Sequence, residues 1–305
     1  PYANQMYLEL ATLPPKSKIV FLQIPNNNYI KDSFFQYFFV GKKSSFTKIP
    51  IVDFLEDANS LHYTTYSSSE SKIYVGPYQI KEQIFWFGTD RFGRDLLSRI
   101  IYGVRVSMAV GLIAVFISLI IGITLGLIAG YFRGRTDDII MWFVNVIWSI
   151  PTLLMVIAIT LALGKGFWQV FVAVGLTMWV EVARIVRGQV IAIRELQYVE
   201  ASKVLAYSPF RIITRHILPN VIGPVIVISA ANFAAAILIE AGLSFLGIGA
   251  QPPIPSWGGI IKDHYSYIIM DKAYLAIIPG LAIMLLVLSF MTLGNRLRDA
   301  FDVRI

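Results

Sequence analysis

Four stretches of this chain are apolar for long enough to cross a lipid bilayer as helices. Crossing the hydrocarbon core takes about 20 helical residues, and a helix satisfies the backbone N–H and C=O groups within the segment itself. A fifth apolar run is shorter and carries Glu181 near its end. We therefore predict an all-α polytopic membrane protein, with spans at about residues 106–132, 139–164, 166–183, 217–239 and 273–295.

The composition agrees with a membrane location. Of the 305 residues, 56% are hydrophobic and only 15% are charged, against about 25% charged in soluble domains. The net charge is +7, but the basic residues lie beside apolar runs, where membrane orientation explains them better than nucleic-acid binding. The chain has no cysteine, which excludes disulfides and thiolate metal sites. We expect it to contact lipid and to bind no nucleic acid, and its sequence contains no catalytic, cofactor or metal-binding constellation.

The orientation follows from the short connections between the runs, because Lys and Arg are enriched in cytoplasmic loops. Basic residues are frequent in residues 184–220 and 296–305 and scarce in residues 240–272. The first two segments are therefore predicted to be cytoplasmic and the third extracytoplasmic. Counting five spans back from the cytoplasmic end also places residues 1–86 outside.

Residues 1–86 predict a small mixed or β-rich domain in water. Short β-prone runs, such as residues 19–22 and 73–75, alternate with stretches rich in Pro, Asn or Ser. A cluster of aromatic residues is expected to form its core, because aromatic side chains dominate small cores, and a sugar or peptide platform is the alternative. The cluster contains Phe34, Phe35, Tyr37, Phe38 and Phe39.

Residues 87–105 predict an amphipathic helix at the membrane surface. Apolar and basic residues alternate there at helical spacing in the sequence FGTDRFGRDLLSRIIYGVR. Thr89 or Asp90 is the expected N-cap of this helix. Gly88 and Gly93 mark bends before it.

A polar stretch between two apolar runs, residues 198–220, reads YVEASKVLAYSPFRIITRHILPN. Ser208 followed by Pro209 is a helix-start signal, so the stretch predicts a helix, a sharp turn and a second helix. A helical hairpin of this kind is suited to docking into a groove on another protein. Its candidate docking residues are Glu200, Ala201, Ser202, Ala206, Ser208, Pro209, His216, Leu218 and Pro219.

This stretch resembles the EAA loop of permease subunits of ABC importers, whose pattern is Glu-Ala-Ala, three residues, Gly, nine residues, Ile, any residue, Leu-Pro. The matching residues are Glu200, Ala201, Leu218 and Pro219. The departures are Ser202 for Ala, Ala206 for Gly and His216 for Ile. Because Ala tolerates positive φ poorly, the change at Ala206 argues against a left-handed turn there, whereas docking needs only a small side chain.

The resemblance covers about residues 87–302 and is strongest to the branch that imports oligopeptides and dipeptides. The ending His-Ile-Leu-Pro-Asn, the Gly-Thr-Asp and Gly-Arg-Asp segment, and residues 251–258 all resemble that branch. It implies the type I transmembrane fold, a first transmembrane helix before residue 1, and a location in the bacterial or archaeal plasma membrane. It also implies a homologous second permease, two ATPase subunits and an external binding protein as partners.

The chain lacks a P-loop, which requires Gly, four residues and Gly-Lys-Ser/Thr. Neither Gly41-Lys42 nor Gly164-Lys165 fits this pattern. ATP and Mg are therefore expected on the partner ATPase subunits, and this chain is expected to be non-catalytic.

Two residues are candidates for the transport pathway or its outer gate. Glu240 ends an apolar run, where it either lines the outer mouth or snorkels to the surface. Trp257 is either an interface anchor or, as the resemblance implies, part of a loop that re-enters near the gate. Glu181 is expected to pair with Arg184 at the interface.

The predicted function is that of the membrane-spanning subunit of an ATP-driven importer of oligopeptides or dipeptides. In the family mechanism, ATP closes the ATPase pair and the docked hairpin moves as a lever that switches the spanning helices. Related permeases carry nickel complexes or other small solutes. An ion-coupled transporter usually needs acidic residues near the midplane, and an intramembrane protease needs Ser with His, or two Asp, within its spans.

Overall fold

The computed structural model describes residues 5–26, 45–57, 60–164 and 166–301. It divides the chain into two compact units. Unit 1 combines residues 1–106 with 251–281, and unit 2 combines residues 107–250 with 282–305. The aromatic cluster at residues 34–39 lies outside the described residues.

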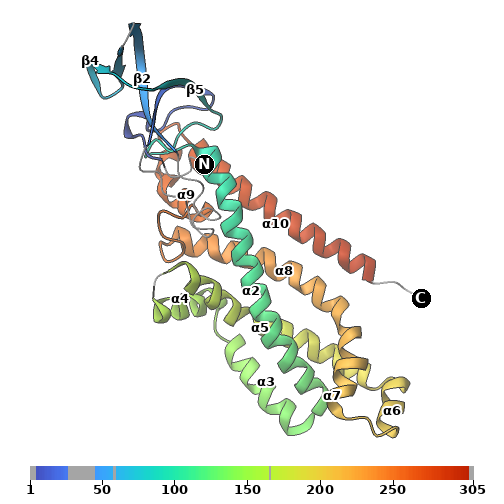
Figure 1. The fold of residues 1–305 in the computed structure, drawn as a ribbon. Coiled ribbons are helices and arrows are strands. Elements are labelled where there is room, and N and C mark those ends of the chain that lie inside the picture. Colours follow the sequence, from blue (N-terminus) through green and yellow to red (C-terminus); the bar gives the residue numbers. More distant parts are fainter. Residues whose placement is uncertain (1–4, 27–44, 58–59, 165, 302–305) are drawn as a thin grey trace. The chain divides into compact units, whose positions relative to one another are not determined.

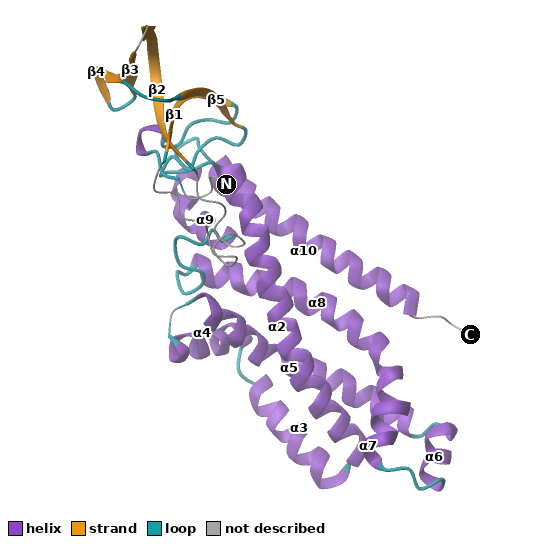
Figure 2. Cartoon of the chain, in the orientation of Figure 1, coloured by secondary structure: helices purple, strands orange, loops and turns teal. Residues whose placement is uncertain are grey.

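Unit 1 contains an antiparallel sheet of five strands in the order β4-β3-β2-β1-β5 (Figure 2). The sheet follows a short 3-10 helix, η1, at Leu8–Leu10. The strands are β1 (Ser17–Pro25), β2 (Phe46–Asp57), β3 (Ser60–Thr65), β4 (Ser68–Tyr74) and β5 (Gln79–Phe85).

The sheet has an apolar cluster on each face, because successive side chains along a strand point to opposite sides. Ile19 and Phe21 of β1 join Phe85 and pack with Leu10 of η1. Leu22 points the other way and packs with Leu61.

The Gly-Thr-Asp segment anchors the start of the chain to the rest of unit 1. Gly88 and Gly93 have φ of 75° and 71°, and a Cβ on Gly93 would lie 1.7 Å from the Tyr7 carbonyl oxygen. Thr89 is buried and its backbone N–H donates to Leu13 O (3.2 Å). Its hydroxyl donates to Leu10 O and accepts from Leu13 N–H. The backbone of this segment therefore lies directly against the backbone of residues 7–13, and only glycine permits so close an approach.

Helix α2 (Leu96–Phe132) begins within the segment that was expected to lie as a separate helix at the membrane surface. Its N-terminus is capped by Asp95, whose carboxylate accepts from the backbone N–H of Ser98 (3.1 Å), so the expectation of a cap at Thr89 or Asp90 is wrong. Asp90 is instead fully buried and accepts from Arg94 N–H and Arg94 Nε at 2.9 and 2.6 Å. Burial raises the pKa of Asp95.

Unit 1 also contains α9 (Trp257–His264), the 3-10 helix η3 (Tyr265–Ile268) and the start of α10 (Tyr274–Phe301). His264 is buried; its Nε2 accepts from Arg91 N–H (3.1 Å), so Nδ1 carries the proton and donates to Ile260 O (2.7 Å). Burial holds the pKa of His264 below its usual value and favours this neutral form.

Among the residues described, the regular elements of unit 2 are all helices (Figures 1 and 2). Its helices are the greater part of α2, α3 (Gly134–Trp148), α4 (Thr152–Leu163), α5 (Phe167–Arg194), α6 (Gln197–Val204), α7 (Pro209–Ile212), the π-helix η2 (Ile213–Ile217), α8 (Leu218–Phe245) and the second part of α10.

Four helical segments are long and apolar enough to cross a membrane, or five if α3 and α4 together form one span. These two helices form a pair bent by 89° at the Pro151 break. Proline has no N–H to continue α3 and restricts the residue before it, which explains the break. Helix α5 continues to Arg194, so Glu181 lies near the middle of its helix rather than near the end.

Helices α2 and α5 pack at backbone distance along a stripe of three glycines on α2, Gly122, Gly126 and Gly130. A Cβ on Gly122, Gly126 or Gly130 would lie 2.6–2.7 Å from Val182, Ala183 or Val190, respectively. Contacts this short leave no room for a side chain, as is typical of small-residue interfaces between membrane helices.

Candidate functional site

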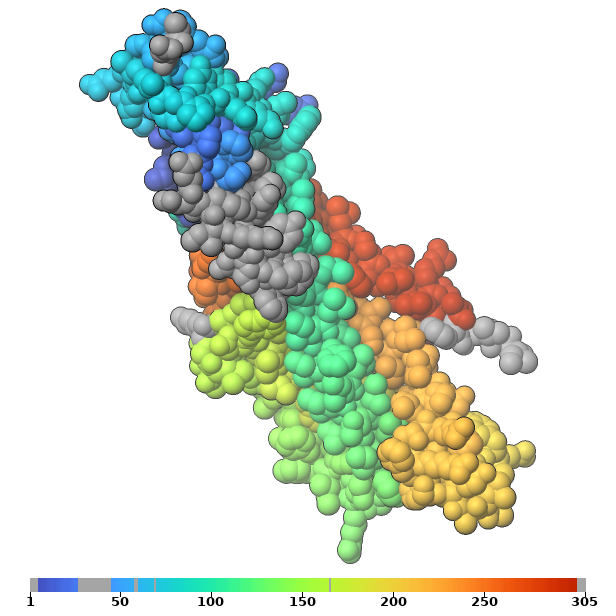
Figure 3. All heavy atoms as spheres, viewed as in Figure 1, coloured from blue at the N-terminus to red at the C-terminus, as the bar shows by residue number. Residues whose placement is uncertain are grey.

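The candidate site is the hairpin formed by α6, α7 and η2, which projects at one end of unit 2 (Figure 3, gold). Ser208 is the N-cap of α7 and its hydroxyl accepts from Arg211 N–H (3.4 Å), with Pro209 at the first helical position. The helix, turn and helix predicted from the sequence are therefore present.

The turn after α6 is left-handed, contrary to what Ala206 indicated. Ala206 has φ of 56°. Its N–H donates to Lys203 O (2.9 Å), and the N–H of Tyr207 donates to Ser202 O (3.2 Å). These two bonds form a Schellman motif, which satisfies the last carbonyls of α6 and outweighs the strain at a residue with a Cβ.

Asn220 fastens the base of the hairpin to α6. Its side-chain amide donates to the carbonyl of His216 (2.7 Å) and to the hydroxyl of Tyr198 (3.2 Å). Pro219 lacks an N–H, so the backbone leaves regular α-helical bonding near η2. The sequence contained Tyr198 and Asn220 at the ends of the predicted stretch, but no pattern indicated that they meet.

An aromatic stack fills the inside of the turn. The rings of Tyr207 and His216 are nearly parallel, with centroids 6.1 Å apart, and the Arg211 guanidinium lies 4.0 Å from the Tyr207 ring centre. His216 therefore packs inside the hairpin. This contact gives its departure from the family pattern a structural role.

The outer surface of the hairpin combines exposed apolar side chains with one acidic residue, Glu200, and three basic ones, Lys203, Arg211 and Arg215. Val204, Leu205 and Phe210 are 86%, 64% and 77% exposed, and Glu200 and Ala201 are exposed beside them on α6. Ser202 was expected to contact a partner, but it is buried and donates to Tyr198 O (2.8 Å). It therefore packs within the hairpin and offers no surface for docking. Pro219 is exposed and Leu218 is half-buried.

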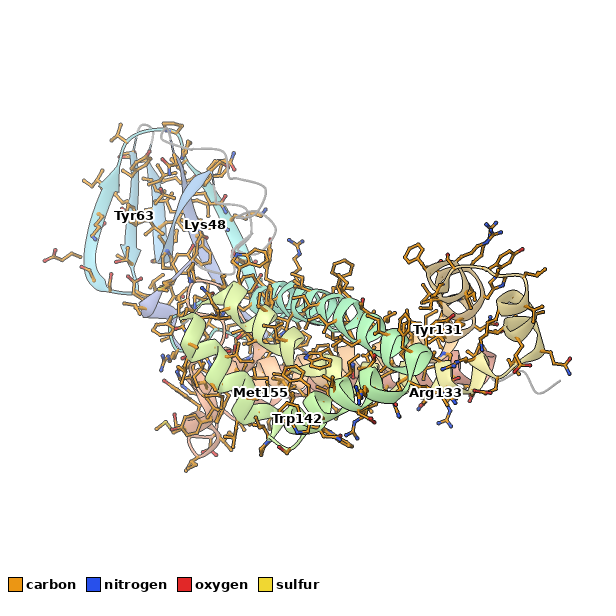
Figure 4. All side chains as sticks on the ribbon, turned by 90° about the horizontal axis from the view of Figure 1, so that it is seen from below. Lys48, Tyr63, Tyr131, Arg133, Trp142 and Met155 are labelled. Carbon is orange, nitrogen blue, oxygen red and sulfur yellow. The ribbon has the colours of Figure 1, made fainter. Side chains whose placement is uncertain are left out.

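Three arginines fasten the hairpin's supporting helices to one another. Arg187 of α5 makes two bonds to Asp137 of α3 (2.5 and 2.6 Å). Arg133 pairs with Glu195 (2.9 Å), and Arg194 donates to Tyr131 O (2.5 Å). Tyr131 and Arg133 lie at the end of α2, close to the hairpin (Figure 4). In the sequence, Arg187 and Arg194 indicated only the orientation of the membrane spans.

The two candidate gate residues are buried. Glu240 is 1% exposed and accepts from Ser244 Oγ (2.6 Å), so the snorkelling alternative is wrong. It lies near the other end of α8, about 33 Å from Leu218 at 1.5 Å per residue. Trp257 is 2% exposed, and its indole N–H donates to Ile100 O (2.9 Å), so it does not lie exposed as an interface anchor.

The expected pair of Glu181 and Arg184 is not formed among the described residues. Arg184 lies 3.4 Å from the ring centre of Trp148 and donates to Asn145 Oδ1. The described residues contain no group of three or more His, Asp or Glu side chains that would hold a metal ion.

These features define a polytopic membrane subunit that carries a preformed hairpin with an exposed apolar surface. Residues 122–305 match the family of binding-protein-dependent transport system inner membrane components, and the chain belongs to this family. It is 40% identical over 220 residues to a glutathione transport system permease protein of Pectobacterium atrosepticum, covering 72% of this chain and 73% of that protein.

Other relatives are named as peptide permeases. The dipeptide transport system permease protein DppC of Bacillus subtilis is 42% identical, covering 72% of this chain and 69% of that protein. The oligopeptide permease protein OppC of the same organism is 38% identical, covering 72% of each chain. An inward-facing structure of the MetNI methionine ABC transporter matches with a TM-score of 0.56 at 18% identity, covering 68% of this chain and 97% of the other, which shows the fold.

Proposed function

We propose that this chain is one of two permease subunits of an ATP-driven importer of oligopeptides or dipeptides. The single observation that carries the proposal is the hairpin: an exposed surface of apolar and charged side chains on a turn closed by hydrogen bonds, in a chain of this family. The names of the relatives support peptides as the substrate class.

The hairpin is suited to transmit movement. Its turn is fixed by the Schellman motif, its base by Asn220, and its supporting helices by the Asp137–Arg187 pair. In the proposed mechanism, ATP-driven closure of two partner ATPase subunits pulls the hairpin as a lever. The displacement passes through α5 and α8 and switches the helices between inward-open and outward-open states. ATP and Mg remain on the partners.

The proposed assembly contains a homologous second permease and an external binding protein that delivers the peptide. We place the hairpin, residues 184–220, and the tail, residues 296–305, in the cytoplasm, and the sheet-containing region, residues 1–86, and loop 240–272 outside a bacterial or archaeal inner membrane. The arginine-rich connections support this orientation.

The test is purification of the chain from its native membrane in mild detergent, followed by mass spectrometry and a peptide-stimulated ATPase assay. We expect ATPase subunits and a second permease to co-purify. Glu200→Lys removes the one acidic group of the docking surface and should strongly lower ATPase recovery or peptide import, whereas Asp299→Lys, an exposed charge reversal on α10, should not. A chain that purifies alone, or normal import by Glu200→Lys, would contradict the proposal.

A further inference from the structure

Unit 2 contains a small pocket where α3 and α4 meet at their bend. It has a volume of about 170 Å³ and lies between α5, α8 and the bent pair. Met155, labelled in Figure 4, contributes from α4, and Thr177, Met178 and Glu181 contribute from α5. The lining combines apolar side chains with two threonines and one carboxyl group.

Glu181 is the unusual member of this pocket. It is exposed and lies in α5 near the end of the apolar run, three residues before the segment that we place in the cytoplasm. It has no hydrogen bond or ion pair to any residue that the structure describes. The nearest cation along α5, Arg184, is held against Trp148 and Asn145.

A carboxylate within a membrane span, even near its cytoplasmic end, is costly to expose to lipid chains, and such residues face the protein interior or a water-filled cavity. The exposed side of α5 at Glu181 therefore has to face either the transport pathway or a cationic group of another subunit. The bent pair of α3 and α4 lies beside Glu181, and discontinuous helices of this kind often form substrate sites in membrane transporters.

We propose that Glu181 and the pocket at the α3–α4 bend form a contact site for the positively charged amino group of a peptide in transit. Every peptide with a free amino terminus carries such a group, and a carboxylate is its natural acceptor. The two threonine hydroxyls add polar contacts, and the methionine side chains adapt to variable residues. This inference rests on the proposed function, since it requires a peptide pathway.

The test uses the complete transporter with its binding protein in proteoliposomes and measures uptake of radiolabelled tripeptides with free amino termini. Glu181→Gln keeps the shape and removes the charge, and it should lower uptake about tenfold, as expected for losing one charge-assisted hydrogen bond. Glu181→Asp keeps the charge on a shorter side chain and should retain most of the uptake. Asp299→Asn, which removes an exposed charge on α10 outside the pocket, is the matched control.

A packing role predicts the reverse order, with Glu181→Gln active and Glu181→Asp impaired, and either result would overturn the inference. Loss of the second permease from purified Glu181→Gln would also overturn it, because Glu181 would then be an intersubunit contact. Failure of the wild-type transporter to import any tripeptide would instead contradict the proposed function itself.

Discussion

Ala206 shows how a single residue departs from a pattern without changing the local structure. The left-handed φ of 56° costs an L-residue about 1–2 kcal/mol, and the two hydrogen bonds of the Schellman motif maintain it. We predict that Ala206→Gly stabilises the hairpin by about 0.5–1 kcal/mol, the strain relieved less the added freedom of the unfolded chain.

Hydrogen exchange of the Ala206 and Tyr207 amides measures this effect, because both amides donate the bonds that close the turn. Ala201→Gly is the matched control, since Ala201 is an exposed residue inside α6, where glycine should destabilise by about 1 kcal/mol. Equal loss of protection in both variants would show that the turn carries no strain at Ala206.

At the same scale, the sequence predicted local signals well and long-range contacts poorly. The cap at Ser208 depends on neighbouring residues only, so residue type predicted it. The contact of Asn220 with Tyr198 and the pair of Arg187 with Asp137 join residues far apart in the chain. Without a pattern in the local sequence, nothing marked these residues as partners.

At the scale of elements, the glycines on α2 determine how closely this helix packs against α5. A Cβ on Gly126 would lie 2.7 Å from the carbonyl oxygen of Ala183 and from the Val186 side chain. We predict that Gly126→Ala separates α2 from α5 and destabilises the protein by about 1–3 kcal/mol, the usual cost of overpacking. Gly188→Ala on α5 should be neutral or stabilising, because nothing lies within 4 Å of its added methyl group.

Thermal unfolding in detergent, followed by size-exclusion chromatography, distinguishes the two alanine variants. Similar melting temperatures for Gly126→Ala and Gly188→Ala would mean that the stability of the α2–α5 interface does not depend on close contact between the two backbones.

Apolar runs predicted that helices exist more reliably than they predicted where helices end. The run at residues 166–183 marks only the apolar part of α5, which continues to Arg194 because its polar end is fastened to α2 by the bond from Arg194 to Tyr131. Pro151 explains why the helix breaks between α3 and α4, but not why the bend is 89°. The size of that bend depends on packing against other helices, which hydropathy does not report.

At the scale of the whole molecule, α2 and α10 each continue from one compact unit into the other. The hairpin belongs entirely to unit 2, and any force on it first reaches α5 and α8. Asp137 and Arg187 connect α5 to α3, and α3 leads through the bend to the pocket at Glu181. This pair is thus placed to transmit hairpin movement to the proposed peptide pathway.

We predict that Asp137→Asn lowers the number of peptides imported per ATP hydrolysed while the ATPase subunits remain bound, because the docking surface on α6 and α7 is untouched. Uptake and ATP hydrolysis measured together in proteoliposomes give this ratio. The charge-swapped pair Asp137→Arg with Arg187→Asp should recover part of it, since the two side chains meet directly at 2.5 and 2.6 Å. A swap no better than Asp137→Asn alone would assign the loss to packing around α3 rather than to the ion pair, and the route from hairpin to pocket would then have to pass through α8.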